Sequence, residues 1–264
     1  MMETTPNLTP ASNPPSRDGI RAVAFDCYGT LIDFTDQRFK ETYHEICVQQ
    51  SLPIEGITLW EKWMEIWRRQ AAQGRARENP RDWPNNDNPR PLSGEGLTFR
   101  PYREEWPEHF QMCFRELGVS GDPVSAYDHV RNRLAEAIAF KETASVLAAL
   151  GARYRLGILS NADDDFLFPC LEKNGLDFEL IVTSERVGFY KPHEAIFQSF
   201  AEAVGVSNDE VFYVGDSPFA DVLGAKRAGM RVAWVNRHGA KLREGAPSPD
   251  HEIASLEGLL DLLL

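Results

Sequence analysis

The chain has 264 residues, of which 42% are hydrophobic and 26% charged, values that are ordinary for a globular protein with one large domain or two small ones. Its 28 basic and 40 acidic residues give a net charge of −12, which argues against general binding to nucleic acids or anionic membranes. A small anionic substrate remains compatible with this charge, because a local cationic pocket can override a distant negative surface.

The first 18 residues are rich in Pro, Thr, Ser and Asn, and we expect a disordered tail there. They lack the apolar region of a signal peptide, and we find no later run of about 18 apolar residues, the length that a membrane helix requires. The four cysteines, Cys27, Cys47, Cys113 and Cys170, have no metal-ligand spacing. We therefore expect a cytoplasmic protein with reduced, mostly buried thiols.

The stretch Ala22–Phe25 is short and apolar, which predicts a strand buried on both faces. It delivers Asp26 to a turn that contains Gly29 and Thr30. Open α/β folds bind ligands at this carboxyl edge of the sheet, but an ordinary turn after a strand has the same pattern. Side chains alternate along a strand, so Cys27 should point away from Asp26.

We expect residues 34–140 to be mainly helical. Apolar residues at helical spacing predict helices over 37–50, 59–72, 102–117 and 123–139. In the second of these, Trp60, Trp63 and Trp67 form a stripe that favours core packing over a ligand site. Residues 79–96 contain four prolines with several Asn and Gly, a composition typical of an irregular excursion that serves as a lid or a mobile segment.

From residue 141 onward, helices alternate with short apolar strands, which predicts βαβ units and a parallel sheet. We expect strands over 155–159, 180–183, 210–214 and 231–235, and helices over 143–150, 164–174, 193–204, 219–228 and 256–264. The predicted fold class is α/β, a Rossmann-like doubly wound parallel sheet with an inserted helical domain. Residues 19–33 and 141–264 form its core.

Polar side chains follow the predicted strands at the edge where Asp26 lies. Ser160 and Asn161 end the second strand, Asp216 follows the fourth, and Lys191 lies between them in a loop. Singly, Ser160 would also fit a helix cap, Lys191 a solvated surface charge and Asp216 a turn residue. Their joint occurrence at corresponding positions favours a functional site.

These elements resemble the four motifs of the haloacid dehalogenase superfamily of hydrolases, in their order and spacing. The matching stretches are Asp26-Cys-Tyr-Gly-Thr-Leu, Leu159-Ser160-Asn161, Tyr190-Lys191-Pro192, and Val214-Gly215-Asp216-Ser217 with Asp221. The resemblance covers about residues 20–33 and 141–264. It implies that residues 34–140 are the cap domain of that superfamily.

The resemblance implies that Asp26 is a nucleophile that forms a covalent intermediate. Backbone N–H groups of the following turn, with the hydroxyls of Thr30 and Ser160, would hold the anionic oxygens of the transferred group. Lys191 would offset negative charge and keep the carboxylates of the site ionised.

The resemblance further implies a Mg²⁺ ion bound by Asp26, Asp216 and the main-chain oxygen of Tyr28, since Mg²⁺ takes few carboxylates and keeps waters. Asp221 would orient a metal-bound water or, alternatively, act only as a favourable acid in the first turn of its helix. Asn161, from the second motif, is a further candidate site residue.

The residue at position 28 departs from the phosphatases of the superfamily, which usually carry there a second Asp that acts as acid and base. A tyrosine, with an ordinary pKa of about 10, does this poorly near neutral pH. Tyr28 instead matches the 2-haloacid dehalogenases, whose halide leaving group needs no proton. Asp216, in contrast, matches the metal-binding phosphatases, because the dehalogenases have uncharged residues there and work without a metal.

Two more positions differ from the dehalogenases: Glu61 stands in place of an expected arginine, and Phe197 in place of a tyrosine. An anionic haloacid would then lose its cationic anchor unless Arg68 or Arg69 replaced it. Candidates to line the cleft are Trp83, Trp106 and Arg100, although buried packing is the favoured role for the tryptophans.

Three hypotheses follow: Mg²⁺-dependent phosphate monoester hydrolysis of a small metabolite, 2-haloacid dehalogenation, or a weakly catalytic protein that binds a phosphorylated ligand. We favour the first. Without a metal, the extra carboxylate of Asp216 would repel both Asp26 and an anionic substrate. The partner would be a small anionic substrate, a phosphorylated metabolite or a haloacid, and both a monomer and a homodimer are compatible with the sequence.

Overall fold

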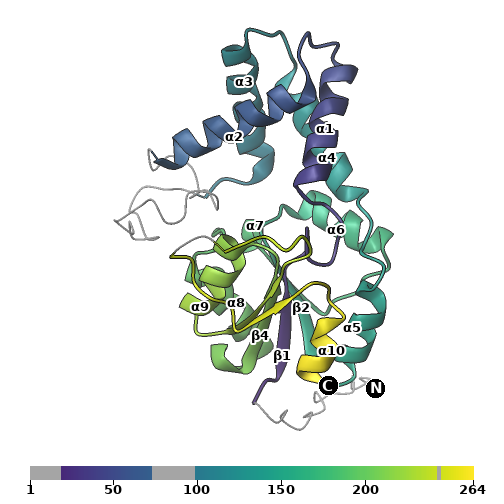
Figure 1. Cartoon of the computed structure of the whole chain (residues 1–264), viewed down its shortest axis with the longest axis vertical. Coiled ribbons are helices and arrows are strands. Elements are labelled where there is room, and N and C mark those ends of the chain that lie inside the picture. Colours follow the sequence, from purple (N-terminus) through teal and green to yellow (C-terminus); the bar gives the residue numbers. More distant parts are fainter. Residues whose placement is uncertain (1–18, 73–98, 243–244) are drawn as a thin grey trace, which may run out of the picture.

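A computed structural model describes residues 19–72, 99–242 and 245–264 of the chain. The predicted tail (1–18) and the irregular segment (79–96), with Trp83, lie outside these residues. Figure 1 shows a sheet flanked by helices, and above it a group of four helices that the chain forms between its first and second strands. We call this group the helical insert.

The sheet has six parallel strands in the order β3-β2-β1-β4-β5-β6, which confirms the predicted α/β doubly wound fold. Its strands are β1 (Ala22–Phe25), β2 (Arg155–Ser160), β3 (Leu180–Thr183), β4 (Val211–Gly215), β5 (Arg231–Val235) and β6 (His251–Ile253). All four residues of β1 are buried, as predicted. Because β1 lies between β2 and β4, the ends of these three strands meet at one edge.

Helices cover both faces of the sheet, and β1 shows how the sequence alternates between them. Val23 and Phe25 belong to the larger hydrophobic cluster, while Ala22 and Ala24 belong to a second cluster on the other face. The flanking helices are α5 (Thr143–Gly151), α6 (Asp164–Lys173), α7 (Ser184–Val187), α8 (Glu194–Val204), α9 (Gly224–Arg227) and α10 (Gly258–Leu263). A π-helical turn, Pro218–Leu223, precedes α9 where one continuous helix was predicted.

The helical insert consists of α1 (Asp36–Gln49), α2 (Gly56–Ala72), α3 (Tyr102–Leu117) and α4 (Pro123–Ala135). Aromatic side chains fill its interior: the ring of Trp63 lies 5.6 Å from Tyr43, 4.6 Å from Phe110 and 5.8 Å from Trp106 between centroids. Trp60 and Trp63 are buried, so the predicted core role of this stripe is confirmed for them. Among the described residues, none of the helices is long and apolar enough to cross a membrane.

Several contacts join the insert to the rest of the chain, and two of them lie near the loops that follow β1 and β2. Its two connecting segments pair with each other, where the N–H of Asp33 donates to the carbonyl of Ile138. The buried carboxylate of Asp163, in the loop after β2, accepts hydrogen bonds from the N–H groups of Tyr102 and Arg103 at 3.0 and 2.9 Å, at the start of α3. The loop that carries the second motif therefore also caps a helix of the insert.

His109 in α3 makes the stability of the insert sensitive to pH. Its side chain is 1% exposed, its ring lies 4.0 Å from that of Trp63, and burial lowers its pKa to about 4. The folded protein therefore binds fewer protons than the unfolded chain between pH 4 and 6.5, and stability falls as the pH is lowered through this window. Between pH 6.5 and 5.5, the wild type should lose about 1 kcal/mol more unfolding free energy than His109→Gln.

Urea unfolding followed by tryptophan fluorescence measures this difference, because three tryptophans lie on the neighbouring helix α2. Equal pH dependence of the two proteins would contradict the assignment of the acid sensitivity to His109.

Candidate active site

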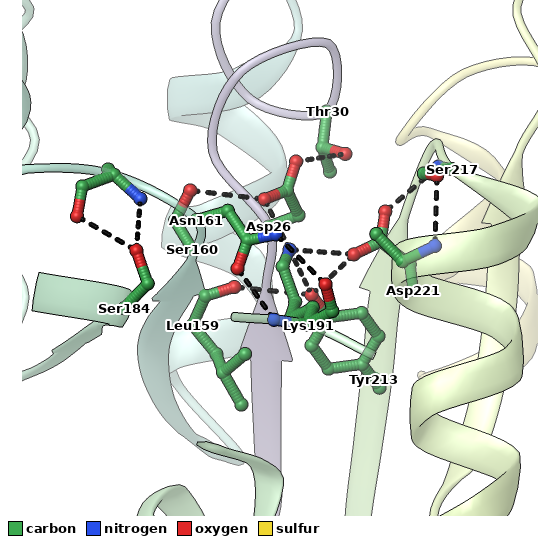
Figure 2. A network of polar contacts seen from close by, with 12 residues as sticks. Asp26, Thr30, Leu159, Ser160, Asn161, Ser184, Lys191, Tyr213, Ser217 and Asp221 are labelled. Atoms are coloured by element: carbon green, nitrogen blue, oxygen red, sulfur yellow. Dashed lines mark hydrogen bonds and ion pairs between the residues drawn. The ribbon is translucent and has the colours of Figure 1, made fainter. Parts of the chain in front are cut away.

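Lys191 lies at the centre of a buried polar network and is only 5% exposed (Figure 2). Its ammonium nitrogen lies 2.6 Å from Asp26 Oδ1, 2.7 Å from Asp221 Oδ1 and 2.9 Å from the hydroxyl of Tyr213. An ammonium has three protons, so each has an acceptor here. Burial opposes the charge, but the two carboxylates outweigh it and raise the pKa of Lys191. The alternative role of Lys191 as a solvated surface charge is therefore excluded.

Asp26 follows β1 directly, and its two carboxylate oxygens have unequal surroundings. Oδ1 accepts hydrogen bonds from Lys191 and, at 3.1 Å, from the hydroxyl of Ser160. Oδ2 is approached only loosely, by the hydroxyl of Thr30 at 3.4 Å. Burial raises the pKa of Asp26, and the ammonium of Lys191 opposes this rise. Oδ2 is therefore the oxygen with more freedom to react with a ligand.

Asn161 holds the backbone of Lys191 through a reciprocal pair of hydrogen bonds. The N–H of Lys191 donates to Asn161 Oδ1 at 2.7 Å, and Asn161 Nδ2 donates to the carbonyl of Lys191 at 3.2 Å. The second motif therefore contributes twice: Ser160 contacts the carboxylate of Asp26, and Asn161 fixes the loop from which the lysine extends.

Asp221 is buried and directs both oxygens to neighbouring groups of the network. Oδ1 contacts Lys191, and Oδ2 accepts from the N–H of Ser217 at 2.8 Å. A Cβ atom on Gly215 would lie 2.4 Å from Asp221 Cγ, so this position requires glycine. Asp221 lies in the π-helical turn Pro218–Leu223, a rare geometry that is frequent at functional sites.

Asp216 follows β4 and completes a group of three acids. One oxygen each of Asp26, Asp216 and Asp221 lies within 4.8 Å of the others. Burial, together with the charges of the other two acids, raises the pKa of Asp216 well above its usual value. Among the described residues, we find no arginine or lysine in an ion pair with Asp216, whereas Lys191 pairs with both others. A cation at this group would offset the remaining charge.

Gly29 allows this approach of the turn to Asp216. Its φ of 89° is in the left-handed region that favours glycine, and an added Cβ would lie 2.5 Å from Asp216 Oδ2. The turn after Asp26 and the loop after β4 are therefore in direct contact. The main-chain atoms of Tyr28 belong to this same turn.

The side chain of Tyr28 has a structural environment instead of a catalytic one. Its hydroxyl lies 3.3 Å from the carbonyl of Leu134 and 3.4 Å from that of Phe166, and its ring contacts those of Phe34 and Phe166. Burial raises the pKa of Tyr28 well above its usual value. The phenol therefore joins the end of the insert to α6 and is not suited to proton transfer.

Four backbone N–H groups of the turn, those of residues 29 to 32, donate to carbonyls within the turn. The N–H of Gly29 donates to the carbonyl of Ile32 at 2.8 Å. Three more N–H groups converge on the carbonyl of Cys27, at 3.3, 2.8 and 2.9 Å, from Thr30, Leu31 and Ile32. These four donors are therefore satisfied within the turn itself.

Tyr213 is a member of the network that sequence reasoning missed. It lies in β4, is fully buried, and its hydroxyl lies 2.8 Å from Asp221 Oδ1. A tyrosine in an otherwise apolar strand was the available signal, because a buried phenol needs a hydrogen-bond partner. Phe197 packs on this tyrosine with 5.3 Å between ring centroids and is itself fully buried.

The other candidates from the sequence lie apart from this network. Cys27 is buried in the larger hydrophobic cluster, and all four cysteines are free and buried, as predicted.

The residues proposed to line the cleft or to bind an anion have other partners. Trp106 is packed in the insert, and the guanidinium of Arg100 pairs with Glu108. Arg69 pairs with Glu116, and Glu61 is exposed on α2. None of the contacts named here brings these residues to Asp26.

The fold and this carboxylate–lysine network define a class of hydrolases. A family model described as haloacid dehalogenase-like hydrolase matches residues 20–229. The chain therefore belongs to the haloacid dehalogenase-like hydrolases, and the family resemblance of its four motifs is confirmed.

Relatives in this family have two kinds of activity. The chain is 27% identical to haloacetate dehalogenase H-2 of Moraxella sp. (strain B), over 92% of this chain and 98% of the relative. It is 24% identical to glyceraldehyde 3-phosphate phosphatase of Pyrococcus abyssi, over 92% of each chain. The magnesium-bound HAD-hydrolase YfnB from Bacillus subtilis has a similar fold, with a TM-score of 0.71, 22% identity, and coverage of 92% of this chain and 98% of that chain.

Proposed function

We propose that this protein is a Mg²⁺-dependent hydrolase that removes phosphate from a small phosphorylated metabolite, with Asp26 as the nucleophile. The observation that carries this proposal is Asp216, a third carboxylate within 4.8 Å of two others that share one lysine. Carboxylates with a nearby main-chain oxygen suit Mg²⁺, and the residues that would hold it are Asp26, Asp216 and the main-chain oxygen of Tyr28. The ion would neutralise charge on the phosphoryl oxygens.

The residues of the chain support a two-step reaction. Lys191 and Ser160 hold Oδ1 of Asp26, which leaves Oδ2 to attack phosphorus. The bond between phosphorus and the leaving oxygen breaks, the leaving group departs with the bonding electrons as an anion, and an aspartyl-phosphate remains. Water then attacks this phosphorus, which releases inorganic phosphate and restores the carboxylate. Asp221 and Asn161 would keep Lys191 aimed at Asp26 throughout.

Tyr28 narrows the range of substrates. Its phenol faces two backbone carbonyls and has a strongly raised pKa, so it would not protonate a departing alkoxide. We therefore favour substrates whose leaving group is stable without a proton, such as acyl or aryl phosphates.

The helical insert would act as the cap over this site. Asp163 and Tyr190 support this role, because they fasten the start of α3 to the loops of the second and third motifs: the hydroxyl of Tyr190 donates to the carbonyl of Arg100 at 2.8 Å. A cap in this position would exclude bulk water from the site while admitting the one water that the second step requires. Four free, buried cysteines fit a reducing compartment, so we also propose a cytoplasmic location.

A 2-haloacid dehalogenase is the second candidate, and Tyr28 is the observation that favours it. In that reaction Asp26 attacks carbon, and halide leaves without a proton. Asp216 argues against it, since an uncompensated carboxylate would repel an anionic haloacid, and Glu61 adds no cationic anchor. A weakly catalytic protein that binds a phosphorylated ligand is the third candidate.

One screen separates the three candidates. Phosphate release from 4-nitrophenyl phosphate and acetyl phosphate, and chloride release from L-2-chloropropionate, are measured with Mg²⁺ and with a chelator. We expect phosphate release that requires Mg²⁺. Metal-independent chloride release would instead establish the dehalogenase. Binding of acetyl phosphate with Mg²⁺ but without turnover would support the third candidate.

A further inference from the structure

Arg237 ties three distant segments of the chain together beside the turn that follows Asp26. It lies two residues beyond the end of β5, on the edge of the sheet where the site is found. Its Nη1 lies 2.6 Å from Glu142 Oε1, and its Nη2 donates to the carbonyl of Thr30 at 2.9 Å. The guanidinium also lies 3.5 Å from the ring centroid of Phe140. One side chain thus joins the nucleophile turn to the segment that leaves the insert.

Burying the Arg237–Glu142 ion pair lowers the free energy of unfolding through the cost of desolvation. The side chains of Arg237 and Glu142 are 13% and 6% exposed, so two charges are removed from water. The Nε of Arg237 is also buried without a hydrogen-bond partner among the described residues. A lysine would place a charge beside Glu142, but a single ammonium lacks the planar fork that contacts both partners. The geometry therefore requires arginine specifically.

The hydrogen bond to Thr30 fixes a peptide plane of the turn. The carbonyl of Thr30 and the N–H of Leu31 belong to one planar trans unit and point in opposite directions. Arg237 holds the carbonyl, and the N–H donates to the carbonyl of Cys27 at 2.8 Å. The next plane is held similarly, because Thr143 Oγ1 donates to the carbonyl of Leu31 at 2.9 Å. Since Cys27 is bonded to Asp26, these planes support the backbone from which the carboxylate of Asp26 extends.

We propose that Arg237 is a positioning residue that holds the turn after Asp26 in shape, and thereby keeps the carboxylate oriented for attack. This role rests on the proposed function, in which Asp26 is the nucleophile. Arg237 acts through the peptide planes of the turn and does not touch the substrate. Loss of its hydrogen bond frees the turn, and a shift of about 1 Å at a reacting group costs about 100-fold in rate.

The test compares Arg237→Gln and Arg237→Lys with the matched control Arg155→Gln. Arg155 also donates to a backbone carbonyl, that of Val204 at 2.5 Å, and pairs with Glu179, but it lies at the start of β2, at the other edge of the sheet. Hydrogen exchange of the peptide 26–33 reports on the turn without any reaction. The kcat and KM for 4-nitrophenyl phosphate with Mg²⁺ report on the chemistry.

Both Arg237 variants should exchange the amides of residues 30–32 at least about 10-fold faster than the wild type and lower kcat about 10- to 100-fold, with KM nearly unchanged. Arg155→Gln should change neither. Unchanged exchange in the turn, or faster exchange with an unchanged kcat, would overturn the proposal. If the wild type releases no phosphate, the proposed function has failed separately, and the exchange of the turn alone decides. If Arg237→Gln does not fold, Arg237→Lys carries the comparison.

Discussion

Replacement of Asp26 by asparagine is expected to lower phosphate release from 4-nitrophenyl phosphate by about 1,000-fold or more. The amide oxygen is a poor nucleophile, and no acyl-phosphate intermediate forms through it. Mass spectrometry of the wild type quenched during turnover of acetyl phosphate should detect one added phosphoryl group. The same experiment with Asp26→Asn should detect none.

The fold should survive this change. Lys191 keeps two partners in the variant, Asp221 and the hydroxyl of Tyr213, so its ammonium is not left unpaired. Asp209→Asn is the matched control, because this exposed acid lies just before β4, at the opposite end of the strand from the site. Equal phosphate release by Asp26→Asn and Asp209→Asn would rule out Asp26 as the nucleophile.

The second large effect is expected for Asp216→Asn. With Mg²⁺ present, kcat/KM should fall about 100-fold or more, since this carboxylate is a proposed ligand of the ion and a neutral amide binds it less well. Without metal, the variant should have a higher melting temperature than the wild type, because one of three crowded negative charges is gone. Addition of Mg²⁺ should raise the melting temperature of the wild type and leave the variant nearly unchanged.

The same variant separates the two reaction types. If the protein is a metal-independent dehalogenase, chloride release from L-2-chloropropionate should persist or increase in Asp216→Asn, because the repulsion of the anionic substrate is reduced. Asp209→Asn again controls for the loss of one charge. Melting temperatures that respond to Mg²⁺ equally in Asp216→Asn and wild type would exclude Asp216 as a metal ligand.

Those parts of the fold that depend on local sequence were predictable. β1 is an uninterrupted apolar run, and β2 to β5 alternate with helices. The spacing of apolar residues and the alternation of strands with helices therefore predict a parallel sheet. β6 was missed because two of its three residues are exposed and it has no apolar pattern. The π-helical turn at Pro218–Leu223 was missed as well, since a single wide turn leaves too short a pattern to distinguish from an ordinary helix.

Some residues of the candidate site were likewise predictable from local sequence, and others were not. Asp26, Ser160 and Lys191 were expected to meet because each follows a strand or precedes a helix at one edge of a parallel sheet. Tyr213 lies in the middle of a strand and Arg237 in a later loop. Tyr213 contacts Lys191, 22 positions away, and Arg237 contacts Thr30, 207 positions away. Such contacts follow from packing in three dimensions, which spacing along the sequence does not encode.

The surroundings of Tyr28 bear on how the two kinds of relatives could interconvert during evolution. A single codon change from tyrosine to aspartate would supply the acid that phosphatases of the superfamily use. In this chain it would also remove a ring that packs on Phe34 and Phe166 and a hydroxyl shared by two carbonyls. The variant would gain a catalytic acid but would lose packing and hydrogen bonds between the insert and the rest of the chain. Substitutions near Phe34 that restore this packing would offset the loss.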